Sequence, residues 1–591
     1  MNESTRQIKV EKDADERIIG YTTTSPVTNK VRGEMTVPPP DVIPVIFVPG
    51  IMGSNLKART DIFLGGKKMA AKNSSIWNVD EVTSALNWIG KDPRRRQALL
   101  NKDLLDVDPR GKVDIFEALE PASRDQIKDI EKTDPALAKT LSNALDAQGA
   151  ARADLRKRGW GTVSWFSYGA FLYWLQEHLN KIQIIKGLPN EPLTQVMKLA
   201  GHAPPGATKP TSVLTEAQIK KLMKFQFPVH AAGYNWLESN LDSGRQLAEY
   251  INNTILQYNG KKGQRCSQVI LVTHSMGGLV SRAAAITYKS PILGIIHGVQ
   301  PIDGAAAFYK RLAAGFGGEG EGFGGRIMGW VSGLALGQNA THTIPMIAYN
   351  PGPLELAPNK LYNSGKPWLF IKDALGRTLK ALPERGDPYH EIYINTTSAW
   401  RTVNPMWLNP AAKSGSPLQE YAKAIGKAMG YHEIHGGKLH SNTYANFGAD
   451  PKHKAWGTVT WMAEAGEMYV PSAWEMGMSQ GMSRPQWIPD RKKALGTPDT
   501  WKFSNGTFAG SERRLLDAQG KEVRMYVQPP ADVGDGTVPA NTSGARIGNY
   551  TGCKVACKLS GFDHQGSYNN SDVRSTVLDA IARMIEPVKI A

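Results

Sequence analysis

A serine at the apex of a predicted strand–turn–helix is the residue of this chain best suited to chemistry. The apolar run 269–272 precedes the pentapeptide THSMG at 273–277, and mostly small residues follow at 278–285. The nucleophile elbow G-x-S-x-G places a serine hydroxyl at such a turn, and here Thr273 replaces its first glycine. The pattern predicts that Ser275 attacks the carbonyl carbon of an ester, thioester or amide. An ordinary strand–helix turn is the alternative, because short motifs also arise by chance.

A serine nucleophile needs backbone donors that bind the oxyanion formed during attack. A buried-strand pattern at 44–48 leads into the hexapeptide PGIMGS at 49–54. At a nucleophile elbow of this type, one donor comes from a loop after an early strand and the other from the residue after the nucleophile. We therefore expect the oxyanion hole to consist of the backbone N–H groups of Ile51 and Met276, with Met52 as a neighbouring candidate.

An acid and a base are expected to follow this nucleophile in the chain order Ser, Asp, His. The segment GDGTVP offers Asp535 between two glycines in a tight turn. The segment GFDHQG offers His564 in a loop just before the last predicted helix. Correct order and loop settings together predict a triad in which Ser275 is the nucleophile, Asp535 the acid and His564 the base.

Other residues are weighed against this triad. Asp303 follows a strand-like run and is the alternative acid, although its place soon after the nucleophile strand suits a structural loop. No group of His, Cys, Asp and Glu has the spacing of a zinc site or an EF-hand loop, so no metal or other cofactor is expected, and a calcium site of another kind is left open. Structural roles are expected for four further histidines, His274, His297, His342 and His440.

Four motifs, PGIMGS, THSMGG, GDGTVP and DHQGSY, resemble those of lecithin–cholesterol acyltransferase-like α/β-hydrolase lipases. The resemblance is closer to bacterial type VI secretion lipase effectors (the Tle family), which are antibacterial phospholipases. Segments 298–305 and 351–356 are also similar to that group. The resemblance implies that Ser275, Asp535 and His564 form the triad. It also implies a membrane phospholipid substrate, an immunity protein and components of the type VI apparatus as partners.

Two further functions stay open beside hydrolysis of a phospholipid acyl ester. A lipid acyltransferase would pass the acyl group to an alcohol instead of water. A membrane-binding toxin would use the hydrolase core only as a scaffold. The sequence does not decide the head group, the sn-1 or sn-2 position of the cleaved ester, the surface that an immunity protein covers, or the oligomeric state.

The strand and helix patterns predict an α/β-hydrolase fold with a mostly parallel central sheet and large insertions. The predicted site spans residues 51 to 564, so one core must close around long insertions. We expect an N-terminal extension at 1–40 and a catalytic domain at 41–591. Its insertions are expected at about 57–160, at 305–345 and, as a cap, at 375–530. The Gly-rich second insertion suits either a lid over a lipid site or a buried Gly/Ala helix.

Charge and cysteine content narrow the partners and the compartment. The formal net charge is +16, and a basic surface attracts anionic lipid head groups and nucleic acid alike. No nucleic-acid-binding signature accompanies the basic clusters at 94–96 and 156–158, so no nucleic-acid partner is expected. No signal peptide or membrane-spanning run is apparent, and the resemblance implies export by the type VI apparatus into the periplasm of a target cell. The three cysteines form no disulfide scaffold, and pairing of Cys553 with Cys557 stays open.

Overall fold

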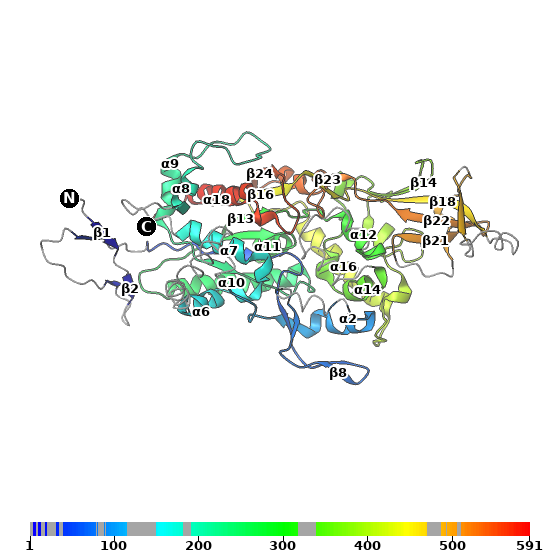
Figure 1. Ribbon diagram of the computed structural model, residues 1–591, viewed down its shortest axis with the longest axis horizontal. Coiled ribbons are helices and arrows are strands. Elements are labelled where there is room, and N and C mark those ends of the chain that lie inside the picture. The colour runs from blue at the N-terminus through cyan, green and yellow to red at the C-terminus, as the bar shows by residue number, and fades with distance from the viewer. Residues whose placement is uncertain are drawn as a thin grey trace, which may run out of the picture.

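Six strands form the central sheet of the computed structural model (Figure 1), and all of them are parallel. Their order across the sheet is β11-β5-β12-β13-β16-β24. The prediction of a mostly parallel central sheet is confirmed. The bounds of the strands are β5 (Val45–Val48), β11 (Val229–Ala231), β12 (Val269–His274), β13 (Ile292–Gly298), β16 (Thr443–Gly448) and β24 (Cys553–Leu559).

The structure describes four short N-terminal strands and most of residues 39–590. The segments left out of that range are 79, 81–87, 89, 115–148, 181–190, 317–338, 470–485, 492 and 505–509.

Helices cover both faces of the parallel sheet, and the strands are apolar on both faces for that reason. Successive side chains of a strand point to opposite faces. Val45 and Phe47 accordingly pack in one core with residues of α7 (Trp165–Asn180) and α18 (Ser571–Ile585). The alternate residues of β5, Ile46 and Val48, pack in a second core with α10 (Asn240–Asn259) and α11 (Gly277–Ile286). The two cores fix the sheet whose carboxyl edge carries the site.

A second sheet of seven strands has the order β15-β14-β18-β22-β21-β20, and β19 pairs with β18. Figure 1 shows several of its strands at the end of the molecule remote from both chain termini. Its buried centre includes Trp461, whose indole Nε1–H donates to the hydroxyl of Tyr309 on α12 (Ala306–Ala314) at 3.2 Å. The strands are β14 (Leu369–Asp373), β15 (Thr378–Leu382), β18 (Val459–Tyr469), β19 (Gln486–Asp490), β20 (Lys502–Phe503), β21 (Glu512–Leu516) and β22 (Glu522–Val527).

The other elements are short, apart from α16, which has 19 residues. The remaining helices are α2 (Pro93–Leu99), α6 (Gly149–Lys157), α8 (Glu191–Met197), α9 (Glu216–Lys220), α14 (Ala340–Ile347), α15 (Pro351–Leu354) and α16 (Pro417–His435). The remaining strands are β1 (Ser4–Gln7), β2 (Val10–Lys12), β3 (Ile18–Gly20), β4 (Val31–Glu34), β6 (Leu56–Ala58), β7 (Ile62–Leu64), β8 (Lys67–Ala70), β9 (Ser75–Trp77), β10 (Leu105–Val107), β17 (Asp450–Ala455) and β23 (Asp532–Gly534).

The fold bears on three expectations from the sequence: the lid, a membrane-spanning helix and the cysteine pair. The centre of the predicted lid, residues 317–338, lies outside the described residues. Within the described ranges, no helix is both long and apolar enough to cross a bilayer. Cys553 and Cys557 are free thiols on the single strand β24. Four residues of a strand span about 13 Å, well beyond the ~7 Å Cα separation that a disulfide tolerates, so the fold does not pair them.

Candidate active site

Ser275 follows β12 in a turn with unusual backbone geometry. Its φ is +50°, in the left-handed region that residues with a Cβ rarely adopt. The Ser275 N–H donates to the carbonyl of Gly298 at the end of the neighbouring strand, at 2.9 Å. A Cβ added to Gly277 would lie 2.4 Å from the carbonyl oxygen of Val48. Only glycine therefore lets α11 begin this close to β5, and the serine is held at the edge of the sheet.

His564 lies in the loop after β24 and faces the serine. Its Nε2 is 2.8 Å from Ser275 Oγ, and its Nδ1 is 2.8 Å from Asp535 Oδ2. A carboxylate oxygen accepts and cannot donate, so we assign the ring proton to Nδ1. Nε2 is then free to accept the hydroxyl proton of Ser275. This tautomer is the one that a general base needs.

Asp535 is fully buried, and both of its carboxylate oxygens have partners. Oδ1 accepts from the backbone N–H groups of Thr537 at 3.0 Å and Val538 at 2.7 Å, while Oδ2 accepts from His564. The backbone N–H of His564 also donates to the carbonyl of Asp535 at 2.8 Å. Two contacts therefore fix the imidazole loop against the acid turn.

The acid reaches the site through a small antiparallel ladder. β17 follows β16 directly and pairs with β23, which ends one residue before Asp535. A Cβ added to Gly448, the last residue of β16, would lie 2.7 Å from the Cβ of Asp535. The acid thus sits against the carboxyl end of a central strand, although the chain between them forms five strands of the second sheet, β18 to β22.

The oxyanion loop, residues 49–54, is held at two of its carbonyls by buried aromatic side chains. The hydroxyl of Tyr234 donates to the carbonyl of Pro49 at 3.0 Å. The indole Nε1–H of Trp77 donates to the carbonyl of Met52 at 2.9 Å. Met52 itself has φ +63°, so the loop takes a tight, strained path. These contacts fix the loop before any substrate binds.

The N–H groups of the predicted oxyanion donors can be compared with those of Gly50 and Gly53, which make hydrogen bonds. The N–H of Gly50 donates to the hydroxyl of Tyr168 at 3.2 Å, and the N–H of Gly53 donates to the carbonyl of Gly50 at 3.1 Å. In the described part of the chain, the N–H groups of Ile51 and Met276 make no hydrogen bond. Both are therefore available to a substrate oxygen.

Tyr168 and His274 add a contact that the motifs did not indicate. The Tyr168 hydroxyl lies 3.1 Å from His274 Nδ1, and His274 Nε2 lies 2.9 Å from the backbone oxygen of His564. Burial lowers the pKa of His274 to about 3, so its ring is neutral near pH 7. The sequence predicted a structural role for His274, which these contacts agree with, but gave no role for Tyr168.

The alternative acid, Asp303, binds residues outside the triad. Its buried carboxylate accepts from Arg546 Nε at 2.6 Å and from the Tyr550 hydroxyl at 2.7 Å. Of the other histidines, His297 is fully buried and shares a hydrogen bond of 3.1 Å with Thr273 Oγ1. These contacts are structural.

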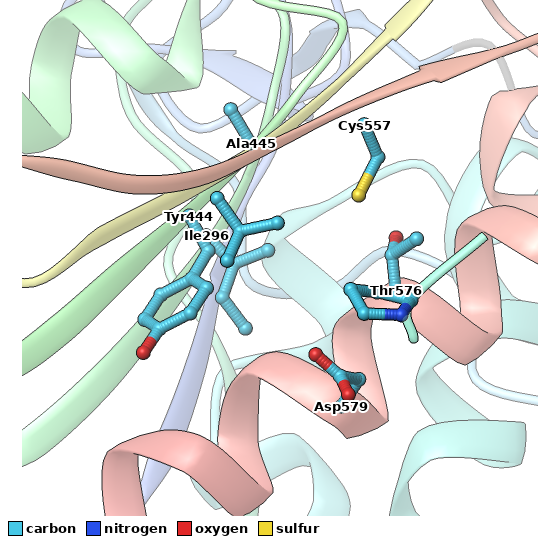
Figure 2. A pocket seen from close by; sticks show the side chains of 8 residues that line it. Ile296, Tyr444, Ala445, Cys557, Thr576 and Asp579 are labelled. Carbon is cyan, nitrogen blue, oxygen red and sulfur yellow. The ribbon is translucent and has the colours of Figure 1, made fainter. Parts of the chain in front are cut away.

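Metal-binding clusters and pockets are the other features that could bind a ligand. In the described ranges, no cluster of three or more His, Cys, Asp or Glu residues is arranged to hold a metal ion. Figure 2 shows a small pocket between the edge of the parallel sheet and α18. Its one carboxylate, Asp579, is paired with Arg583 Nε at 2.6 Å, and no triad residue lines the pocket. The pocket is therefore separate from the serine site.

A parallel sheet covered by helices on both faces, with a strained serine after a central strand and a histidine after the last one, defines an α/β hydrolase. The structure brings together every residue of the predicted triad, and among the residues that it describes no acceptor binds the N–H of either predicted oxyanion donor.

Comparison with known proteins agrees with this class. The family of PGAP1-like alpha/beta domains matches residues 193–307, which contain Ser275. Among solved structures, the chain is similar to one in the crystal structure of the Tle4–Tli4 complex, with 25% identity and a TM-score of 0.65. That match covers 93% of this chain and 99% of the other. No curated protein matches. The resemblance to the Tle lipase effectors is thereby confirmed, and the chain is a lipase-like α/β hydrolase.

Proposed function

We propose that this chain is a serine phospholipase that hydrolyses acyl esters of membrane glycerophospholipids. The observation that carries the proposal is the unbroken path from Ser275 Oγ through His564 to Asp535, with 2.8 Å at each step. Beside it, the N–H groups of Ile51 and Met276 are left for an oxyanion. A serine in an ordinary strand–helix turn would need neither the histidine and aspartate nor the two backbone N–H groups.

The geometry supports acyl transfer in two steps. Ser275 Oγ attacks the ester carbonyl carbon while its proton passes to His564 Nε2. The carbonyl oxygen becomes an oxyanion that accepts from the N–H groups of Ile51 and Met276. His564 then gives the proton to the departing alcohol, which leaves an acyl-enzyme. His564 next takes a proton from water, which attacks the acyl-enzyme carbonyl. As the bond from the acyl carbon to Ser275 Oγ breaks, His564 returns the proton to the serine and the fatty acid is released. Asp535 holds the tautomer and stabilises the imidazolium in both steps.

The lipid substrate and the partners are supported by likeness and by charge. The motifs resemble those of phospholipase effectors, and the chain is similar to Tle4 over nearly all of its length. Tle4 was solved in a complex with Tli4, so we propose that an immunity protein binds this chain in the producing cell. The formal charge of +16 favours docking on anionic bilayers. We propose that the protein is an antibacterial effector that the type VI apparatus delivers to the periplasm of a target cell.

The nucleophile is tested by Ser275→Ala on vesicles of phospholipids labelled separately at sn-1 and sn-2. Loss of a triad nucleophile costs on the order of 10⁶ in kcat, so fatty-acid release should vanish. Ser281→Ala is the matched control, because the Ser281 hydroxyl is buried nearby on α11 with no hydrogen-bond partner in the described chain. It should keep wild-type activity.

Three outcomes would contradict the proposal. Fatty-acid release by folded Ser275→Ala would remove the nucleophile assignment. Acyl transfer to an added lipid alcohol at the expense of free fatty acid would indicate an acyltransferase. Dye leakage from vesicles without acyl cleavage would indicate a membrane-binding toxin.

A further inference from the structure

Two buried rings connect the oxyanion loop to the loop of the catalytic base. The chain of contacts begins at the N–H of Gly50, which lies 3.2 Å from the hydroxyl oxygen of Tyr168. The same oxygen lies 3.1 Å from His274 Nδ1, and His274 Nε2 lies 2.9 Å from the backbone oxygen of His564. We call these two side chains the Tyr168–His274 bridge. It joins α7, the nucleophile strand and both catalytic loops.

The chemistry of the end groups fixes the direction of every hydrogen bond in the bridge. The carbonyl oxygen of His564 can only accept, so His274 Nε2 carries the ring proton. Nδ1 of the neutral ring then accepts, and the hydroxyl of Tyr168 must donate to it. The hydroxyl oxygen in turn accepts from the N–H of Gly50. This arrangement satisfies all four groups, and the side chain of Gln565 also interacts with the Tyr168 hydroxyl.

Packing leaves the bridge no room to relax. Tyr168 and His274 are 1% and 2% exposed. The ring of Tyr168 packs on that of Phe47 in β5, with centroids 4.8 Å apart. A Cβ added to Gly50 would lie 2.7 Å from His274 Nδ1. The oxyanion loop therefore lies directly against the imidazole of His274. A shift of the oxyanion loop or of the His564 loop is expected to move the other.

We propose that Tyr168 and His274 are positioning residues that set the distance between the oxyanion hole and the catalytic base. The proposal rests on the proposed serine hydrolase function. Neither residue is placed to touch the reacting atoms. Their role is to hold the N–H of Ile51 and the imidazole of His564 at a fixed separation, because a misplacement of about 1 Å can cost ~10²-fold in rate.

The first test is Tyr168→Phe, which removes one oxygen and keeps the ring. It leaves the N–H of Gly50 and Nδ1 of His274 without their partner. The matched control is Tyr258→Phe, which removes a hydroxyl that lies 2.9 Å from Nε2 of the buried His230. Both variants lose one buried tyrosine–histidine hydrogen bond, and Tyr168→Phe also loses the one from the Gly50 N–H, so its melting temperature should fall at least as far as that of Tyr258→Phe.

Kinetics on a short-chain ester should separate the two variants. For Tyr168→Phe, kcat should fall by about 10- to 100-fold with KM within about twofold of wild type, because a transition-state geometry is lost and not ground-state binding. Tyr258→Phe should keep the wild-type kcat. At His274, the glutamine variant retains an amide donor for the carbonyl of His564, so His274→Gln should keep more activity than His274→Leu.

Amide hydrogen exchange tests the bridge without reference to hydrolysis. In Tyr168→Phe, exchange should accelerate in both segments 49–54 and 560–566, whereas Tyr258→Phe should leave both unchanged. Unchanged exchange in either segment of Tyr168→Phe, or a kcat equal to that of Tyr258→Phe, would overturn the proposal. Hydrolysis retained by Ser275→Ala would instead overturn the proposed function, and exchange would still decide whether the bridge exists.

Discussion

At the scale of single residues, the acid is identified by its partners. Asp535 and Asp303 are both fully buried carboxylates, and the chain places both after the nucleophile. Asp535 accepts from His564, whereas Asp303 is occupied by Arg546 and Tyr550. Chain order and turn type were enough to predict Asp535, because each is visible in the sequence. The partners of Asp303 could not be predicted from the sequence, because Arg546 lies far along the chain and no motif links the two residues.

The two carboxylates should therefore respond to the same substitution in opposite ways. Asp535→Asn loses the acceptor that fixes the His564 tautomer, so kcat should fall by about 10⁴-fold with little change in stability. Asp303→Asn removes one partner of a buried ion pair, so it should cost about 3–5 kcal/mol of unfolding free energy while the folded protein keeps most of its kcat. Urea unfolding and ester kinetics on both variants measure the two effects. A dead but stable Asp303→Asn beside an active Asp535→Asn would reverse the assignment.

At the scale of elements, the site depends on close approaches that only some motifs reveal. The strand patterns predicted β5, β12 and β13 because their apolar runs are continuous. The position of the acid beside β16 was not predictable, because β17 and β23 are short and pair across five intervening strands, β18 to β22. The Tyr168–His274 bridge was missed for a related reason: it depends on where α7 crosses the parallel sheet, and helix placement leaves no mark in local sequence.

Replacing the elbow glycine tests the closest of these approaches. Gly277→Ala would put a methyl group 2.4 Å from the backbone oxygen of Val48, which is part of a central strand. The strand or the elbow must shift, so the variant should lose about 1–3 kcal/mol of stability together with much of its kcat. The control is Gly426→Ala in α16, where nothing lies within 4 Å of the added carbon. That variant should gain about 0.5–1 kcal/mol, because alanine suits a helix interior better than glycine. Equal melting temperatures for the two variants would contradict this view of the elbow.

At the scale of the whole molecule, burial of neutral histidines links stability to pH. Desolvation lowers the pKa of five of them to about 3 or 4, below the ordinary value of 6.5. Unfolding exposes these rings, so the unfolded chain binds more protons than the folded one below pH 6.5, and stability must fall with pH. Buried Glu355 acts in the opposite sense, because its pKa is raised to about 8 and its contribution is lost as pH rises toward that value. The five are His230, His274, His297, His432 and His435.

The five buried histidines outweigh Glu355 in this pH range. The unfolding free energy should therefore decrease steadily from about pH 6.5 to pH 4, by up to ~1.4 kcal/mol per pH unit for each histidine. Urea unfolding at several pH values measures the slope. His230→Gln is the informative variant, because His230 lies between the hydroxyls of Tyr250 and Tyr258 and contacts no catalytic residue. Removing its proton uptake should make the slope shallower by about one proton, so the variant's deficit near neutral pH should shrink as the solution is acidified. A slope that the variant leaves unchanged would mean that His230 is as protonated in the folded protein as in the unfolded chain, and that burial of neutral rings does not set the acid limit of this fold.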